Sequence, residues 1–167
     1  FRRYQIGSVF RDEPVSASRF REFTQCDIDI IGDSSINADA EIIALVNDIL
    51  KELKIEAEIE VNNRKLVEAV LESVQITDKK NVMKLLDKMG KIEEDMLKAE
   101  LRKYADSKQI ITLFKILEKD FDFFMENSFD GANELKELKE LCRNYGFNIK
   151  VNPYMVRGLS YYTGNVF

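Results

Sequence analysis

The chain begins with two stretches of alternating polar and apolar residues, 4–13 and 19–31, on either side of the five-residue run PVSAS. Alternation with a period of two is typical of β-strands, because successive side chains point to opposite faces. Two such stretches around a short loop predict an antiparallel hairpin. This hairpin excludes an all-helical fold, so the other elements must be arranged together with a sheet.

Helical and strand patterns alternate after the hairpin. Apolar residues recur at helical spacing over 34–54, and the stretch 55–61 alternates again as a half-buried strand does. Between residues 63 and 146, Leu, Lys, Glu and Asp dominate and Pro is absent. Strand character returns over 147–156 and 157–167. In the block 63–146 we expect amphipathic helices over 63–75, 78–103, 107–127 and 132–145, with Gly90 as the place where the second would break.

The order of these elements predicts an α+β fold with an antiparallel sheet, because the strands are not joined by repeated single-helix crossovers. The 84-residue stretch 63–146 then reads as an all-helical domain inserted into a sheet-based chain. We therefore expect three segments: 1–62, the helical insertion 63–146, and a return to the sheet over 147–167.

The amino-acid composition limits which catalytic groups, metal sites and partners we expect. The chain has no His, which removes the usual general base and the commonest neutral metal ligand, and we expect no metal held by protein ligands. Its two cysteines lie far apart in sequence and favour a reducing, cytoplasmic setting. No window is apolar enough for a transmembrane helix, so we expect no membrane partner. The net charge of −5 gives no overall signal for nucleic acid.

One face of the predicted hairpin gathers an unusual set of side chains. On the first strand, Arg11 and Glu13 lie on this polar face. The opposite face of the second strand is apolar and can pack on a core; it carries Phe20, Cys26, Ile28 and Ile30. A solvated surface with ion pairs is one reading of the polar face. The other is recognition of an anion, because Arg suits planar phosphate or carboxylate contacts and a ring among charges can stack on a base. On the second strand this face carries Arg19, Arg21, Phe23, Gln25, Asp27 and Asp29.

Two motifs resemble a known family. The run FRDEPVSASRFREFTQCDIDIIG, residues 10–32, is similar to motif 2 of class II aminoacyl-tRNA synthetases, which reads F-R-x-E, loop, R-x-x-x-F. Its ending, Q-x-x-x-D followed by I-I-G, resembles the histidine-specific version. The run RGLSYYTGNVF, residues 157–167, resembles the second histidine signature R-G-L-D-Y-Y-T-G-x-V-F. The chain is thus identified as a member of the histidyl-tRNA synthetases, with part of the antiparallel class II sheet and a flanking helix.

The resemblance implies an ATP site on the hairpin. It assigns Arg11 to the α-phosphate, Glu13 to the adenine amino group and Arg19 to the γ-phosphate. Phe23 would stack on the adenine. ATP is then a substrate that arrives with Mg²⁺, which is held mostly by phosphate oxygens and water.

The resemblance also implies a histidine site. Gln25 would contact the amino group of the substrate and Asp29 its imidazole ring. Arg157 would bind the substrate and act with Arg11 as a catalytic residue, since a fixed guanidinium stabilises the charge that develops on the α-phosphate. Tyr161 and Tyr162 would line the histidine pocket; the alternative for both rings is core packing.

Two positions depart from the family pattern. Asp29 stands where the family often has Glu, so its side chain is one methylene shorter. Ser160 stands where the family usually has Asp, which removes a charge beside the tyrosines. Either change bears on the selection of histidine.

The expected activity is that of a histidine–tRNA ligase: ATP and histidine give histidyl-adenylate, and the histidyl group then passes to tRNA. The family's insertion domain approaches the tRNA acceptor arm, although 63–146 holds sixteen basic and seventeen acidic residues and its charge alone favours a solvated helical surface. Its phenylalanines, Phe121, Phe123, Phe124 and Phe129, are expected to pack the insertion core. The alternative function is a synthetase-like regulatory or tRNA-sensing module without ligase activity.

The chain begins without Met in what reads as the middle of a strand, and we expect it to be a fragment. No motif 1, motif 3 or anticodon-binding domain is recognisable in it. In this family motif 1 builds the dimer interface, so the resemblance implies that the full-length protein is a homodimer. We expect the isolated chain to be inactive or nearly so.

Overall fold

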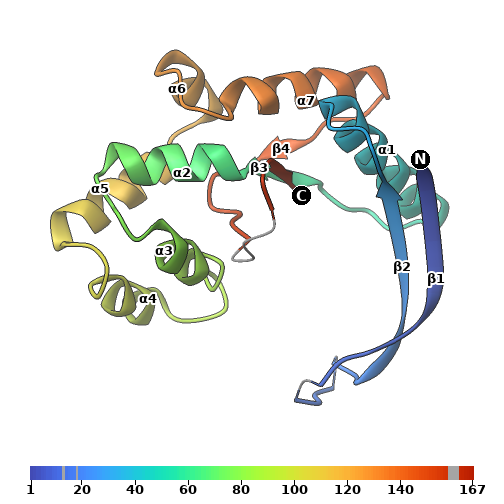
Figure 1. Cartoon of the computed structure of the whole chain (residues 1–167), viewed down its shortest axis with the longest axis horizontal. Coiled ribbons are helices and arrows are strands. Elements are labelled where there is room, and N and C mark those ends of the chain that lie inside the picture. Colours follow the sequence, from blue (N-terminus) through green and yellow to red (C-terminus); the bar gives the residue numbers. More distant parts are fainter. Residues whose placement is uncertain (13, 18, 158–161) are drawn as a thin grey trace.

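The computed structural model describes residues 1–12, 14–17, 19–157 and 162–167. It has an α+β architecture with a long hairpin, a set of helices and a small central sheet whose strands come from both sides of the helical block (Figure 1). The elements are β1 (Arg2–Phe10), β2 (Glu22–Ile30), α1 (Ile36–Glu52), β3 (Glu60–Asn63), α2 (Arg64–Ser73), α3 (Lys79–Leu86), α4 (Glu94–Leu101), α5 (Ser107–Leu117), α6 (Phe121–Glu126), α7 (Ala132–Asn144), β4 (Lys150–Val151) and β5 (Asn165–Val166).

The predicted hairpin is confirmed. β1 and β2 pair antiparallel from Arg2 opposite Ile30 to Phe10 opposite Glu22, and together they form a two-stranded sheet. The pairing continues beyond the strands, since the Arg11 amide donates to the Arg21 carbonyl at 2.8 Å. Figure 1 shows the outer half of this ribbon extending away from the helices.

The apolar side of the hairpin does not pack on a core as expected. Ile28 and Ile30 are half-buried where α1 crosses that end of the sheet, and Arg2 donates to Glu41 of α1 at 2.6 Å. Further along the ribbon, however, Phe20 is 60% exposed and Cys26 is also exposed. The described core lies instead among the helices.

Helix boundaries follow local capping chemistry. Asp78 caps α3 by accepting from the Asn81 amide, and Asp106 forms a capping box with Gln109 at the start of α5. The predicted helix over 78–103 is broken as expected around Gly90, whose φ of +75° favours glycine. The predicted helix over 107–127 is also two helices, because Asp120 caps α6 after a short turn.

The central sheet differs from the expected antiparallel arrangement. β3 lies between the other two strands, parallel to β4 and antiparallel to β5. The predicted strand over 55–61 is confirmed only at its end, because residues 55–59 form no regular structure and Ile55 is 50% exposed. The later strands are likewise reduced to two residues each.

Among the described residues, one apolar core joins α1, β3, the helices α2 to α7 and the segment 149–156. It extends from Ile43 of α1 through Val61 of β3 and Leu135 of α7 to Val156. Phe124 is fully buried in it, with its ring edge-on to Phe129 at 5.5 Å between centroids. The other phenylalanines of this region pack against the same core, which confirms their predicted role. Within the described ranges, no helix combines the length and apolar character needed to cross a bilayer.

Candidate functional site

The polar face of the hairpin forms as its alternation predicts. Phe23, Gln25, Asp27 and Asp29 lie on one side of β2 and are half-buried, while Thr24 on the opposite side is exposed. The register places Val9 opposite Phe23 and Gly7 opposite Gln25, so the residue directly across from the amide has no side chain. A strip of ring, amide and carboxylates therefore runs along one strand.

Arg11 links two members of this strip. Its guanidinium carbon lies 4.7 Å from the centroid of the Phe23 ring, and its Nη2 donates to Gln25 Oε1 at 2.9 Å. Gln25 in turn donates from Nε2 to Asp27 Oδ1 at 2.7 Å. A guanidinium has five N–H donors, so the bond to Gln25 leaves Arg11 able to bind an anion as well. The arginine is thus held in place from two sides, on the surface.

Asp29 lies at the anchored end of the strip. It is opposite Arg3 in the register and accepts from Arg3 Nε at 2.7 Å. The carboxylate is therefore oriented by a neighbouring strand. The sequence analysis did not predict this contact of Arg3. Its odd-numbered position, which it shares with Arg11, could have placed it on the polar face of the hairpin.

The tip of the hairpin carries the remaining predicted ATP contacts. Arg19 is exposed, and its backbone forms two hydrogen bonds with Ser16, of 3.0 and 3.2 Å. These bonds close the turn and direct the chain back toward β2. Glu13 lies outside the described residues.

A second group comes from the segment before β5. The Arg157 guanidinium carbon lies 5.8 Å from the centroid of the Tyr162 ring, a spacing that fits a cation–π contact. Both residues line a narrow cavity of about 10 Å³ beside Met155 and Val67. Tyr161 and Ser160 lie outside the described residues.

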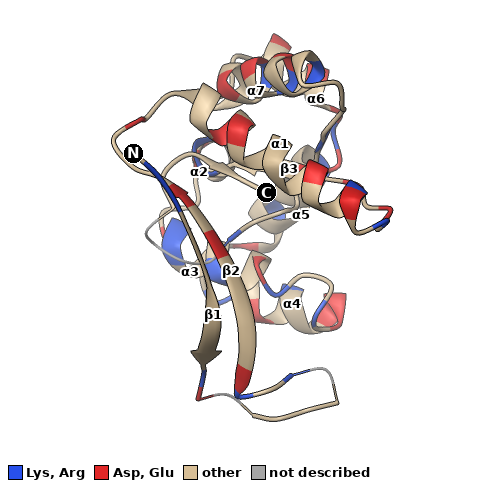
Figure 2. Ribbon diagram, turned by 90° about the vertical axis from the view of Figure 1, so that its right-hand side faces the viewer, with Lys and Arg blue, Asp and Glu red and all other residues tan. Residues whose placement is uncertain are grey.

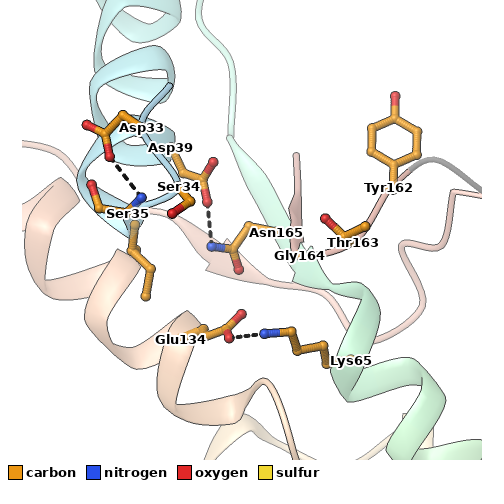
Figure 3. A pocket seen from close by; sticks show the side chains of 11 residues that line it. Asp33, Ser34, Ser35, Asp39, Lys65, Glu134, Tyr162, Thr163, Gly164 and Asn165 are labelled. Carbon is orange, nitrogen blue, oxygen red and sulfur yellow. Dashed lines mark hydrogen bonds and ion pairs between the residues drawn. The ribbon is translucent and has the colours of Figure 1, made fainter. Parts of the chain in front are cut away.

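Tyr162 also borders a larger cavity of about 510 Å³, shown in Figure 3. Residues from the start of α1, from α2, from α7 and from β5 surround it. Two charged contacts lie in its wall: Lys65 with Glu134, and Asn165 with Asp39 at 2.8 Å. The sequence predicted Tyr162 as a pocket residue, but no pattern pointed to the residues of α1, α2 and α7 that complete this cavity.

The carboxylates of this wall have shifted pKa values. Burial raises the pKa of Asp39 above its ordinary range, and the bond from Asn165 opposes this only in part. Burial would also raise the pKa of Glu134, but hydrogen bonds from Lys65 and Asn63 outweigh it and lower the pKa. The surroundings of Glu134 therefore favour its charged form, whereas those of Asp39 disfavour its charged form.

The structure brings the predicted residues together in two groups rather than one. Arg11, Phe23 and Gln25 form the first, and Arg157 with Tyr162 the second. Neither cavity beside Tyr162 is lined by Arg11 or Gln25. Charge elsewhere is mixed: Figure 2 shows Lys and Arg as well as Asp and Glu over the helical block.

A guanidinium held between a ring and an amide on a strand face agrees with the motif 2 hairpin of class II aminoacyl-tRNA synthetases, the class that the sequence resembles. Comparison with known proteins gives the particular family. The sequence matches the histidyl-tRNA synthetase family over residues 1–167. The chain belongs to this family.

Individual relatives agree. The chain is 37% identical over 181 residues to histidine–tRNA ligase 1 of Bacillus cereus, an alignment that covers 100% of this chain and 42% of that protein. The histidyl-tRNA synthetase of Nostoc sp. PCC 7120 superposes with a TM-score of 0.86 at 30% identity, covering 99% of this chain and 42% of that one. The chain therefore spans less than half the length of these relatives.

A further structure shares the fold. It is described as an ATP phosphoribosyltransferase regulatory subunit/histidyl-tRNA synthetase from Bacillus halodurans C, and it superposes with a TM-score of 0.79 at 20% identity. The alignment covers 98% of this chain and 46% of that one. At this identity the likeness concerns the fold alone.

Proposed function

We propose that the chain contributes part of the ATP and histidine sites of a histidine–tRNA ligase. The histidine carboxylate attacks the α-phosphorus of ATP, the bond to the β-phosphate oxygen breaks, and pyrophosphate leaves with its electron pair. A terminal hydroxyl of tRNA then attacks the carbonyl of histidyl-adenylate and AMP leaves. Neither step needs a protein nucleophile, so orientation and fixed charge supply the catalysis.

One observation carries this proposal: Arg11 contacts both Phe23 and Gln25. Phe23 is assigned to the adenine and Gln25 to the amino group of histidine, and Asp29 lies further along the same strand for the imidazole. In histidyl-adenylate the phosphate lies between the adenosine and the amino acid. The order of residues on the hairpin face is thus the order of groups along the intermediate.

Arg157 and Tyr162 supply the second part of the proposed site. A guanidinium resting on a ring is restrained without being neutralised, so Arg157 can meet the charge that grows on the α-phosphate. Tyr162 and Tyr161 would line the histidine pocket. Glu13 and Arg19 keep their proposed contacts with the adenine amino group and the γ-phosphate of Mg²⁺-bound ATP.

The remaining assignments rest on the family. We propose the segments 1–62 and 147–167 as catalytic core and 63–146 as the helical insertion that approaches the tRNA acceptor arm. We also propose, from the family resemblance alone, that the complete protein is a homodimer. Activity in the cytoplasm fits the reduced cysteines and the need to meet tRNA.

Histidine-dependent exchange of pyrophosphate into ATP, measured on the complete protein, tests the proposal. We expect Arg11→Ala to lower the rate about 100-fold or more, because one charge stabiliser of the transition state is lost. Thr24→Ala is the matched control on the opposite face of β2 and should leave the rate unchanged. Equal rates for the two variants would contradict the assigned role of Arg11.

The same assay separates the ligase from a regulatory or tRNA-sensing module. A module without ligase activity would bind its ligand but show no exchange in the unchanged protein. The ligase is favoured because a relative that covers the whole chain at 37% identity is named histidine–tRNA ligase.

A further inference from the structure

Two consecutive asparagines, Asn62 and Asn63, end β3, and both are fully buried. Buried amides destabilise a fold unless their hydrogen bonds are formed, so each contact of these side chains is significant. In the part of the chain that the structure describes, no buried side-chain polar atom lacks a partner. Both asparagine side chains therefore have hydrogen-bond partners, and these partners show what the pair holds in place.

Asn62 holds the chain just before Arg157. Its Nδ2 donates to the carbonyls of Pro153 and Met155, each at 3.0 Å. Its Oδ1 accepts from the amide of Asn63 at 2.8 Å. The side chain thus ties the end of β3 to two positions within four residues of Arg157.

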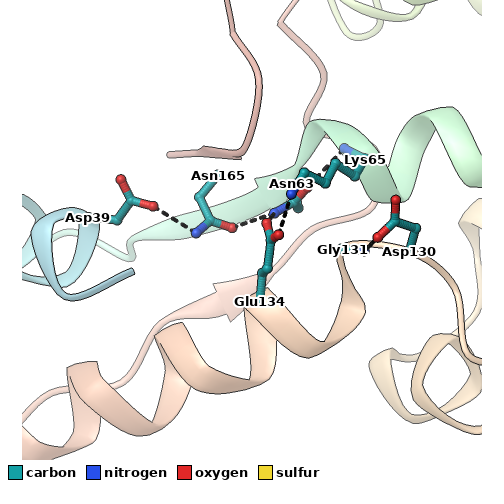
Figure 4. A network of polar contacts seen from close by, with 7 residues as sticks. All are labelled: Asp39, Asn63, Lys65, Asp130, Gly131, Glu134 and Asn165. Atoms are coloured by element: carbon teal, nitrogen blue, oxygen red, sulfur yellow. Dashed lines mark hydrogen bonds and ion pairs between the residues drawn. The ribbon is translucent and has the colours of Figure 1, made fainter. Parts of the chain in front are cut away.

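Asn63 holds the chain just after Tyr162. Its Nδ2 donates to Asn165 Oδ1 at 2.8 Å and to Glu134 Oε2 at 2.7 Å. Its Oδ1 accepts from the Lys65 amide at 2.8 Å and so caps α2. Figure 4 shows these contacts as one chain from Asp39 through Asn165 and Asn63 to Glu134.

The backbone repeats the same pattern. β3 lies between β4, which leads into Arg157, and β5, which follows Tyr162. The amide of Asn152 donates to the Val61 carbonyl at 2.9 Å, and Asn63 is opposite Asn165 in the antiparallel pair. The side chains and the backbone at the end of β3 therefore fix the chain on both sides of the segment 157–162, where Arg157 and Tyr162 are its two described histidine contacts.

We propose that Asn62 and Asn63 are positioning residues for Arg157 and Tyr162, and that they act through residues 153–155 and Asn165; this inference rests on the proposed function. The pair sets where the guanidinium and the ring meet histidine. The proposed ATP contacts lie on the hairpin formed by β1 and β2, which Asn62 and Asn63 do not contact through the hydrogen bonds described above. Loss of the pair therefore weakens the binding of histidine and leaves the binding of ATP.

The test is pyrophosphate exchange by the complete protein carrying Asn62→Leu, with histidine and ATP varied in turn. Misplaced contacts should raise the histidine KM, so that kcat/KM for histidine falls about 100-fold, while the ATP KM changes less than about threefold. A purely structural role would reduce the folded fraction without separating the two KM values. Thermal unfolding of the same samples establishes that the assay temperature lies below the transition.

Gln109→Leu is the matched control. Its Nε2 also donates to two carbonyls, those of Val74 at 3.1 Å and Gln75 at 2.9 Å, but within the helical block. Because Gln109 is half-buried, we expect some loss of stability, with no change in the histidine KM. A similar histidine effect in both variants would overturn the inference, because general destabilisation would then explain it.

A second variant covers the case in which Asn62→Leu does not fold. Asn165→Ala releases the other end of the segment from Asn63 and Asp39 at a half-buried position, and the same selective loss for histidine is expected. An unchanged histidine KM in a folded, active variant overturns the inference about the asparagines but not the proposed function. Absence of exchange in the unchanged protein overturns the proposed function, and the inference falls with it.

Discussion

Gly131 offers the sharpest test of how the helical block is joined to β3. It precedes α7 with a φ of +80°, and a Cβ placed there would lie 2.7 Å from Asn63 Oδ1 and 2.8 Å from the Leu66 amide nitrogen. Neither neighbour can move freely. Asn63 is fully buried with its amide bonded on both sides, and the Leu66 nitrogen belongs to the backbone of α2.

The substitution Gly131→Ala combines two penalties. The left-handed conformation disfavours an L side chain by about 1–2 kcal/mol, and forcing a methyl group into a packed site adds about 1–3 kcal/mol. We therefore expect the free energy of unfolding to fall by about 2–5 kcal/mol, the sum of these terms. Urea unfolding followed by far-ultraviolet circular dichroism measures the change.

Gly90→Ala is the control that separates the two terms. Gly90 has a similar φ of +75°, but a Cβ there would meet nothing within 4 Å. Only the conformational penalty of about 1–2 kcal/mol applies to it. If the two variants lost the same stability to within about 0.5 kcal/mol, the close contact between Gly131 and Asn63 would be refuted.

Two further predictions concern the buried carboxylate and the core. The raised pKa of Asp39 means that its ionisation opposes folding, so stability contributed by the protonated form is present below its ordinary pKa of 3.8 and is lost as the pH rises through the folded-state value. Asp39→Asn keeps an acceptor for Asn165 and should unfold at a higher temperature than the unchanged chain at neutral pH, with the difference shrinking in acid; a lower midpoint at neutral pH would contradict this reasoning. Phe124→Ala should reduce the free energy of unfolding by about 3–5 kcal/mol in urea titration, since a fully buried ring leaves a cavity, whereas a loss below about 1 kcal/mol would show that the site collapses.

Local patterns predicted most of the secondary structure because they act over a few residues. Alternation placed the hairpin and the face that holds Phe23 and Gln25, and turn residues such as Gly90 marked breaks between helices. The capping of α6 by Asp120 was overlooked, although Asp before an apolar run is a known start signal. That error merged two helices into one.

Contacts between distant parts of the sequence could not be predicted in this way. The parallel pairing of β3 with β4 joins strands separated by the whole helical block. The bonds of Asn63 to Glu134 and of Asn165 to Asp39 span 71 and 126 residues, and an isolated asparagine carries no periodic signal. Exposure of Phe20 escaped prediction for a related reason: alternation gives the two faces of a strand but not what covers them.

The hairpin is attached to the rest of the protein at one end only, near its first and last residues. Arg2 grips α1 through Glu41, and the Ile31 amide donates to the Phe1 carbonyl at 2.8 Å, so the root near Asp29 is stiff. We expect the outer part of this two-stranded ribbon to move more than its root, because a lone hairpin is only marginally stable and Phe10 and Phe20 near the tip are exposed. If the proposed assignments hold, the amino-acid end of the site is fixed by the body of the protein, whereas the nucleotide end around Arg11 and Phe23 lies on the less supported part of the ribbon.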